Sequence, residues 1–251
     1  MNPMALRKLA AAQIAVQPGN IPTNVARHVA FAARAAAHGC RLVVFPELSL
    51  LGYELALASR NVLAPDHAVL HPLRHAASAT GATLIVGAPL RGSGDSVHIG
   101  AILFHPDRTT TTHTKVHVHS SEMHVFQPGP GAPPILIDGD SVALAICADA
   151  SHPQHAALAA AQGACIYAAG VMITEDAMER KSAFLAQYAE AYAMLTLLAN
   201  FSGVSGGEIS GGRSAIWAPG GRLVARAPGN AECLVLAARG SDSWSGQVLP
   251  F

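Results

Sequence analysis

The chain has 251 residues, of which 51% are hydrophobic and 13% are charged. A chain of this length and apolar content can bury a large core, which excludes disorder as its overall state. Basic and acidic residues are equal at 16 each, and only 5% of residues are aromatic. Without an excess of positive charge the protein is not suited to bind phosphates, and with few aromatic residues it is not suited to stack on bases. We therefore expect no nucleic-acid partner.

The sequence also indicates a protein without a membrane partner. No apolar run reaches the roughly 18 residues that a membrane-spanning helix needs. Arg7 and Lys8 precede a short apolar run in the manner of a signal peptide, but Gln13 interrupts that run, which favours a buried first strand. The four cysteines are widely spaced and form no C-x-x-C pair, so they predict no disulfide framework. We therefore expect a cytoplasmic protein with reduced thiols.

Predicted strands and helices alternate along the chain. We expect strands at residues 8–16, 41–45, 82–87, 97–104, 109–118, 141–146, 165–169, 194–200, 213–217, 223–227 and 233–237. Helices are expected at residues 20–38, 66–80, 153–162 and 174–192 because apolar residues recur there with helical spacing. The glycine-rich segment 203–212 is expected to be a flexible loop, either a rim or a mobile lid. The mixture predicts an α/β layered fold with a mixed sheet, in one domain over residues 1–251.

Three residues with catalytic chemistry lie at the ends of predicted strands. Glu47 follows the strand at 41–45, Lys115 lies in or at the end of the strand at 109–118, and Cys147 ends the strand at 141–146. Loops past the carboxyl ends of strands are where α/β folds gather function, so these side chains can converge. A carboxylate base and a nearby cation would each favour the thiolate that attacks, and the cation would also stabilise an oxyanion. Taken singly, each residue also has a structural explanation. Glu47 and Lys115 could be solvated surface charges, and Cys147 could be packed in the core as a small hydrophobic residue.

The segments around these residues resemble the motifs of the nitrilase, or carbon–nitrogen hydrolase, superfamily. Residues 45–53 (FPELSLLGY) are similar to its first catalytic motif, 115–118 (KVHV) to its lysine motif, and 142–149 (VALAICAD) to its nucleophile strand. Residues 126–129 (FQPG) and the predicted hairpin at 212–221 also match, in the family's order along nearly the whole chain. The resemblance implies a four-layer αββα sandwich and a reaction that needs no metal or organic cofactor.

The resemblance also implies a role for individual residues. Glu47 would be the general base, Cys147 the nucleophile that forms a thioester, and Lys115 the group that stabilises the tetrahedral oxyanion. The backbone N–H of Ala148 would be a second oxyanion donor. Glu122 is the only acidic residue between Lys115 and residue 126, so it would hold the substrate amide or orient the lysine.

The expected substrate is a small linear amide. The segment 169–172 (AGVM) falls where the family lines its pocket, so Gly170 and Val171 are expected to support binding and to favour an uncharged aliphatic acyl group. Residues 148–161 lack the Trp–Glu pair of nitrilases and any Arg or Lys that would hold a carbamoyl amino acid. Acyl transfer from the same thioester is the main alternative. Carbamoyl-amino-acid hydrolysis, nitrile hydrolysis and a non-catalytic binding protein fit the residues less well.

A histidine metal site is the sharpest rival hypothesis. His113, His117 and His119 alternate with Lys115 in one predicted strand, so they would share a face, and imidazoles on one face can bind zinc. No Cys or Asp lies among them, and the lysine would place an ammonium inside the cluster. We therefore expect no metal.

The resemblance implies at least a homodimer as well. Family members generally pair across a helical face near the nucleophile, and the alanine-rich segments 153–162 and 182–192 could supply one. The remaining cysteines, Cys40, Cys165 and Cys233, are expected to be buried and inert.

Overall fold

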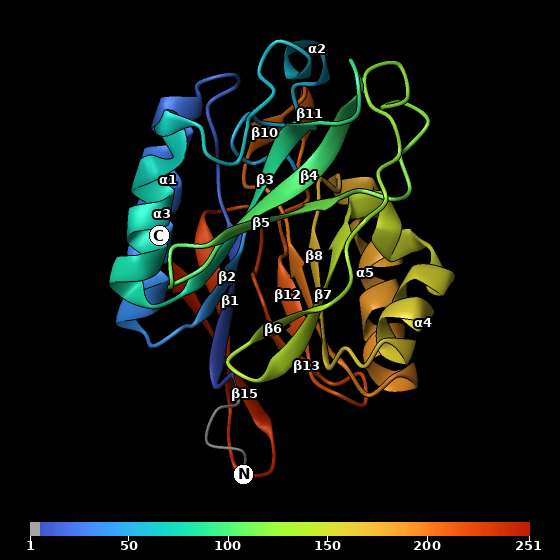
Figure 1. The fold of residues 1–251 in the computed structure, drawn as a ribbon. Coiled ribbons are helices and arrows are strands. Elements are labelled where there is room, and N and C mark those ends of the chain that lie inside the picture. Colours follow the sequence, from blue (N-terminus) through green and yellow to red (C-terminus); the bar gives the residue numbers. More distant parts are fainter. Residues whose placement is uncertain (1–5) are drawn as a thin grey trace.

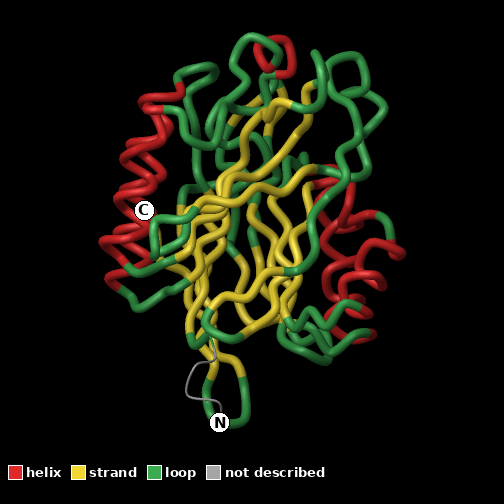
Figure 2. Tube along the Cα trace, viewed as in Figure 1, coloured by secondary structure: helices red, strands yellow, loops and turns green. Residues whose placement is uncertain are grey.

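A computed structural model describes residues 6–251 (Figure 1). Two β-sheets lie face to face, with α1 (Ile21–Ala37) and α3 (His71–Thr80) on the outside of one sheet. Helices α4 (Pro153–Ala161) and α5 (Glu175–Ala191) lie on the outside of the other. Figure 2 shows the same arrangement, with strands in the two central layers and helices on the two flanks. The predicted αββα sandwich is confirmed.

The first sheet has seven strands in the order β15-β14-β1-β2-β3-β4-β5. These strands are β1 (Lys8–Gln13), β2 (Leu42–Val44), β3 (Thr83–Arg91), β4 (Val97–Phe104), β5 (Thr110–Thr114), β14 (Cys233–Arg239) and β15 (Trp244–Pro250). Strands β1, β2 and β3 are parallel, whereas β4 is antiparallel to β3 and β5 is antiparallel to β4. Strand β5 therefore runs in the same direction as β2, and both strands end at the same edge of the sheet.

The second sheet has six strands in the order β13-β12-β9-β8-β7-β6. These strands are β6 (Ile135–Ile137), β7 (Asp140–Ile146), β8 (Ile166–Gly170), β9 (Leu195–Ala199), β12 (Ala215–Trp217) and β13 (Leu223–Arg226). The smaller elements are α2 (Leu55–Ala58), the 3₁₀-helices η1 (Ala68–Leu70) and η2 (Cys147–Ser151), and a hairpin of β10 (Val204–Ser205) and β11 (Glu208–Ile209). Strands β7, β8 and β9 are parallel and covered on both faces, which is why they are continuous apolar runs in the sequence.

Alternate side chains of strand β7 face two different layers of the fold. Val142, Leu144 and Ile146 belong to the apolar cluster between the sheets, whereas Ala143 and Ala145 belong to the cluster under α4 and α5. This division follows from the two-residue period of a strand. The alternation places large side chains between the sheets and small ones under the helices.

Local sequence sets the ends of α1 close to the predicted bounds. The side chain of Asn20 accepts a hydrogen bond from the backbone N–H of Thr23 at 3.3 Å, and a proline occupies the first turn, where its missing N–H costs nothing. Gly39 follows the helix with φ of 80°, a conformation that glycine adopts without strain.

Several predicted elements differ from the structure. The expected strand at 109–118 ends at Thr114. The backbone N–H of Lys115 still donates to Ile99 of β4, but those of Val116 and His117 donate to the Asp149 carboxylate instead of a neighbouring strand. The segment 203–212 contains the β10–β11 hairpin rather than an unstructured loop, and the helix at 66–80 divides into η1 and α3. Strands β6 and β15 were not predicted.

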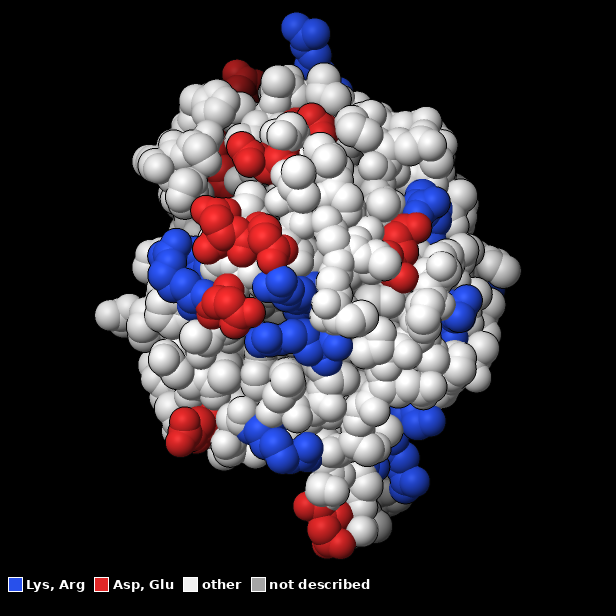
Figure 3. Space-filling model, turned by 180° about the vertical axis from the view of Figure 1, so that it is seen from behind, with Lys and Arg blue, Asp and Glu red and all other residues white. Residues whose placement is uncertain are grey.

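Cys40 and Cys233 are buried as expected, but Cys165 is only half-buried; all four cysteines are free thiols. No helix among residues 6–251 is both long and apolar enough to cross a membrane. On the face seen in Figure 3, basic and acidic side chains lie interspersed, and most of that face carries neither.

Candidate active site

Glu47 lies just past β2, in a turn held between glycines of two other strands. A Cβ on Gly87 of β3 would lie 2.3 Å from the carbonyl oxygen of Pro46. A Cβ on Gly170 of β8 would lie 2.6 Å from the carbonyl oxygen of Phe45. Both positions therefore need glycine, because a side chain would push the turn away. The two sheets thereby fix the backbone that carries Glu47.

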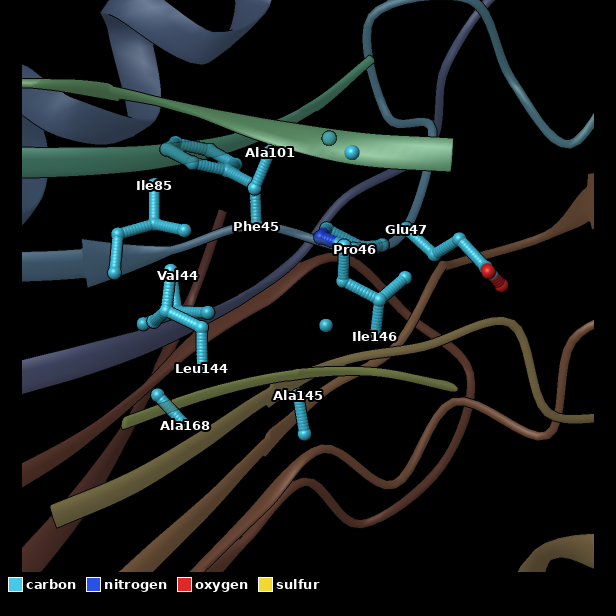
Figure 4. A pocket seen from close by; sticks show the side chains of 13 residues that line it. Val44, Phe45, Pro46, Glu47, Ile85, Ala101, Leu144, Ala145, Ile146 and Ala168 are labelled. Atoms are coloured by element: carbon cyan, nitrogen blue, oxygen red, sulfur yellow. The ribbon is translucent and has the colours of Figure 1, made fainter. Parts of the chain in front are cut away.

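Behind this turn the sheets enclose a small apolar cavity of about 20 Å³. Figure 4 shows Val44, Ile85 and Leu144 around it, with Glu47 at one end and its carboxylate directed away from the cavity. A space of this size holds about one water molecule and offers it few polar partners. The base of the Glu47 turn is thus a largely apolar interior.

The Lys115 ammonium lies between two carboxylates. Its Nζ is 2.6 Å from Glu47 Oε1, and 2.8 and 2.7 Å from the two oxygens of Glu122. The side chains of Lys115 and Glu47 are fully buried, and Glu122 is 0% exposed. Charges buried this deeply are stable only when paired and hydrogen-bonded, so the three groups depend on one another. Burial lowers the pKa of Lys115, but the neighbouring carboxylates raise it above its usual value, so the lysine stays charged.

The two glutamates differ in what they accept. Glu122 takes further hydrogen bonds from the hydroxyl of Tyr53 at 2.6 Å and from the backbone N–H of His119 at 2.8 Å, so both of its oxygens are occupied twice. Glu47 Oε2 is buried and accepts no conventional hydrogen bond from the described residues. Glu47 is therefore the carboxylate that retains capacity for a proton.

The pKa of Glu47 suits proton transfer. Burial raises the pKa of Glu47 to about 7; the Lys115 ammonium only partly opposes this shift, and the charge of Glu122 adds to it. A general base works best when its pKa lies near the operating pH.

Cys147 follows β7 and begins η2. Its φ of 45° is uncommon for a residue other than glycine and marks a sharp turn from strand to helix. The Sγ atom donates to the carbonyl oxygen of Met172 at 3.5 Å. Burial and the charge of Glu47 raise the pKa of the Cys147 thiol, with Lys115 opposing them. The resting thiol is therefore protonated and needs a base before it can attack.

Asp149 joins the Cys147 turn to the segment that follows Lys115. Its fully buried carboxylate accepts hydrogen bonds from the backbone N–H groups of Ile146 at 3.1 Å and His117 at 2.7 Å, and it also contacts His117 Nδ1 at 3.0 Å. The sequence motif contains this aspartate, but no sequence pattern indicated which backbone N–H groups it would bind. Tyr53 was missed for the same reason.

A cavity of about 290 Å³ opens beside Cys147. Tyr53, Glu122, Cys147 and Ala148 lie on one part of its wall. The lining also includes His119 and Ser121, then Met172, Ile173 and Thr174 from the segment before α5, Ala177 and Lys181 from α5, and Glu208 from β11.

Gly170 and Val171, which we expected to support binding, do not line this cavity. Gly170 packs behind Glu47, and the backbone N–H of Val171 still pairs with the carbonyl of Ala199 at 2.9 Å, inside the strand layer. The chain leaves the sheet only after Val171. Of the segment 169–172 that was expected to line the pocket, Met172 lines the cavity, whereas Gly170 and Val171 do not.

The histidines do not form the face expected of a metal site. His113 is buried, whereas His117 has left the strand and stacks on His152, with ring centroids 3.8 Å apart. Within residues 6–251, no group of three or more His, Cys, Asp and Glu side chains is placed to hold a metal ion.

Comparison with known proteins identifies the family. A family model described as carbon-nitrogen hydrolase matches residues 8–245. The chain belongs to the carbon–nitrogen hydrolase family. The resemblance read from the sequence is therefore confirmed, and with it the prediction of an enzyme of this class. Of the residues predicted from the sequence, Glu47, Lys115 and Glu122 form one hydrogen-bonded cluster, and Glu122 and Cys147 line the same cavity.

Solved structures with the same fold include several of an amidase from Nesterenkonia sp. AN1, a member of the nitrilase superfamily. A cysteine-to-serine variant is 23% identical with a TM-score of 0.85, and the match covers 95% of this chain and 93% of that one. A cysteine-to-alanine variant in complex with butyramide is 23% identical with a TM-score of 0.85, covering 95% and 92%. A glutamate-to-leucine variant carries the acetamide moiety of fluoroacetamide on its active-site cysteine; it is 24% identical with a TM-score of 0.85, covering 94% and 92%.

Proposed function

We propose that this carbon–nitrogen hydrolase is an amidase that cleaves a small linear amide through a thioester on Cys147. The observation that carries the proposal is the buried Lys115 ammonium, which binds Glu47 at 2.6 Å and Glu122 at 2.8 Å, while Glu122 and Cys147 line one cavity. The charges of Glu47 and Lys115 both act on the Cys147 thiol. The cavity of about 290 Å³ accommodates a short acyl chain. The same proposal takes residues 1–251 as a single catalytic domain.

The first half of the reaction forms the thioester. Glu47 takes the proton from the Cys147 thiol, and the sulfur attacks the amide carbon. The negative charge that develops on the amide oxygen is stabilised by the Lys115 ammonium and by the backbone N–H of Ala148. When the C–N bond breaks, Glu47 returns the proton to the leaving nitrogen, and ammonia or an amine departs.

The second half regenerates the enzyme. Glu47 takes a proton from a water molecule, and the hydroxide attacks the thioester carbon. The C–S bond breaks, the carboxylic acid leaves, and the sulfur recovers its proton from Glu47. Glu122 acts as a positioning residue, because its two oxygens hold Lys115 while Tyr53 and His119 hold Glu122. No step calls on a metal or an organic cofactor.

The related amidase supports this chemistry. Its structures include a complex with butyramide, a short aliphatic amide, and a covalent adduct at its active-site cysteine. Butyramide has the size of ligand that the cavity beside Cys147 would hold. A cysteine that forms a covalent bond to an acetamide moiety is a nucleophile, which is the role we propose for Cys147.

We further propose a cytoplasmic homodimer. The four free thiols suit a reducing compartment. Helix α4 exposes 58% of Leu158 at a position where a second subunit would bury it. This face follows shortly after η2, so a partner packed there would also stabilise the turn that carries Cys147.

Ammonia release from a panel of short aliphatic amides, dicarboxylate monoamides, carbamoyl amino acids and nitriles tests the proposed function. We expect release that disappears in Cys147→Ala and persists with a chelator. Release that survives Cys147→Ala but stops with the chelator would refute the thioester and favour a metal site. Addition of hydroxylamine separates the fates of the acyl group, because efficient hydroxamate formation with little free acid would indicate acyl transfer.

A further inference from the structure

Lys181 places a positive charge in the wall of the cavity that contains Cys147. It extends from α5, is half-buried, and lines the cavity together with Met172 and Ile173. Its Nζ donates a hydrogen bond to Ser151 Oγ at 2.7 Å. Ser151 ends η2, the same short helix that begins with Cys147. The ammonium is therefore fixed at a defined place relative to the nucleophile.

The charge of Lys181 has no carboxylate partner in the part of the chain that the structure describes. Its hydrogen bond to Ser151 uses one of three N–H groups, and the ion pairs found among residues 6–251 do not include it. The rest of this wall is largely apolar. Water screens a half-buried ammonium less than an exposed one, so an anion brought into the cavity would gain from it.

We propose that Lys181 forms a subsite for an anionic group at the far end of the acyl chain. The preferred substrates are then short monoamides of dicarboxylic acids, with the amide at Cys147 and the carboxylate at Lys181. This inference rests on the proposed amidase function and names its substrate class. It replaces the uncharged acyl group expected from residues 169–172, because of that segment only Met172 lines the cavity, whereas α5 adds the charged Lys181 to its wall.

Besides the buried Glu122, Glu208 is the acidic residue among those that line this cavity. It lies in the β10–β11 hairpin and is exposed to solvent. Water therefore screens its charge more strongly than that of Lys181. A substrate with a cationic tail is the alternative that Glu208 would favour, and the test includes it.

Three amides of similar length decide between these tails. Succinamate carries a terminal carboxylate, isocaproamide has the same shape with two methyl groups in place of the carboxylate oxygens, and gamma-aminobutyramide carries an ammonium. We expect wild-type kcat/KM to be highest for succinamate. The ratio of succinamate to isocaproamide should fall about 10- to 100-fold in Lys181→Met, as expected for loss of a hydrogen-bonded charge pair.

Two control variants separate the subsite from general effects. Arg180→Met removes an exposed positive charge from the adjacent position of the same helix. Ser151→Ala removes the hydrogen bond that Lys181 donates but keeps the ammonium. We expect Arg180→Met to keep the wild-type preference for succinamate within about threefold, since it leaves the Lys181 ammonium and its hydrogen bond in place. We expect Ser151→Ala to weaken that preference less than Lys181→Met does, since it frees the ammonium without removing its charge.

The outcomes distinguish failure of the subsite from failure of the proposed function. Three results would overturn the subsite while the proposed amidase function remains, provided that hydrolysis depends on Cys147. They are no preference for succinamate, a preference for the cationic amide, and a preference for succinamate that is unchanged in Lys181→Met. If no amide is hydrolysed, the proposed function fails, and calorimetry of succinamate with Cys147→Ala decides the subsite alone. Binding that requires Lys181 would then support it, and no binding would overturn it.

Discussion

Replacing Asp149 by Asn would remove the carboxylate that joins the Cys147 turn to the Lys115 segment. One carboxylate oxygen accepts the backbone N–H of Ile146 at 3.1 Å, and the other accepts the backbone N–H of His117 at 2.7 Å. An asparagine side chain keeps a single acceptor. Whichever way its amide is oriented, the NH₂ group faces one of these two donors, of which that of Ile146 is buried and that of His117 partly buried.

The expected cost follows from these contacts. A hydrogen bond to a charged group contributes about 1.5–3 kcal/mol, and a buried donor left without a partner costs about 1–3 kcal/mol. The surviving hydrogen bond also loses its charge. We therefore expect Asp149→Asn to lower the free energy of unfolding by about 2–4 kcal/mol, which lowers Tm by about 4–16 °C for a domain of this size.

Urea denaturation with an unchanged m-value measures this loss. Asp138→Asn is a matched control, because Asp138 pairs with Arg41 at 3.0 Å on the surface, and both side chains are at least one-third exposed. A surface pair contributes about 0–1 kcal/mol, so the control should change stability little. A loss below about 0.5 kcal/mol in Asp149→Asn, the size of an ordinary surface substitution, would refute the reasoning.

Three further results are expected. Glu47 must be ionised to accept a proton, so kcat/KM should rise with pH through about 7, and Glu47→Gln should abolish activity. A kcat/KM that does not change between about pH 5 and pH 8 would contradict the assignment of Glu47 as the base. Tyr53→Phe removes the 2.6 Å hydrogen bond to Glu122 and should lower kcat/KM about 10-fold in steady-state assays, whereas unchanged kinetics would show that Glu122 needs no such support. Gly87→Ala should destabilise the fold by about 1–3 kcal/mol or more in a thermal melt. Gly229→Ala is the control and should not, because nothing lies within 4 Å of its added Cβ. Equal melting temperatures of the two variants would contradict the close packing of Gly87 against the Glu47 turn.

The sequence was sufficient to find the central residues of the site, but not their geometry. Glu47, Lys115 and Cys147 could be predicted because each lies in a recognisable motif, in or at the end of a predicted strand or just after one. Their convergence depends on facts that appear only in the fold. Strand β5 runs parallel to β2 in one sheet, and β7 ends beside them in the other.

The residues that sequence analysis missed contact partners far along the chain. Tyr53 binds Glu122, which is 69 residues away, and Lys181 binds Ser151, which is 30 residues away. No local spacing or composition indicates such pairs. Asp149 was visible beside the nucleophile, but its partners at 116 and 117 belong to a segment whose end was placed too late.

Missed strands also have physical causes. Strand β15 contains glycine and proline, and most of its residues are exposed, so it shows no apolar alternation. The β10–β11 hairpin turns at Gly206 and Gly207, with φ of 62° and 77°. Glycines at positive φ serve a tight hairpin turn as readily as a flexible loop, so their composition cannot separate the two.

The central claim is that Cys147 carries the acyl group during turnover. Mass spectrometry of wild-type protein, quenched while it hydrolyses a short amide, tests this claim most directly. We predict a mass gain equal to the acyl group on the peptide that contains Cys147, lost on treatment with hydroxylamine and absent from Cys147→Ala. Continued turnover in Cys147→Ala, with no acyl mass on the wild-type peptide, would contradict the account.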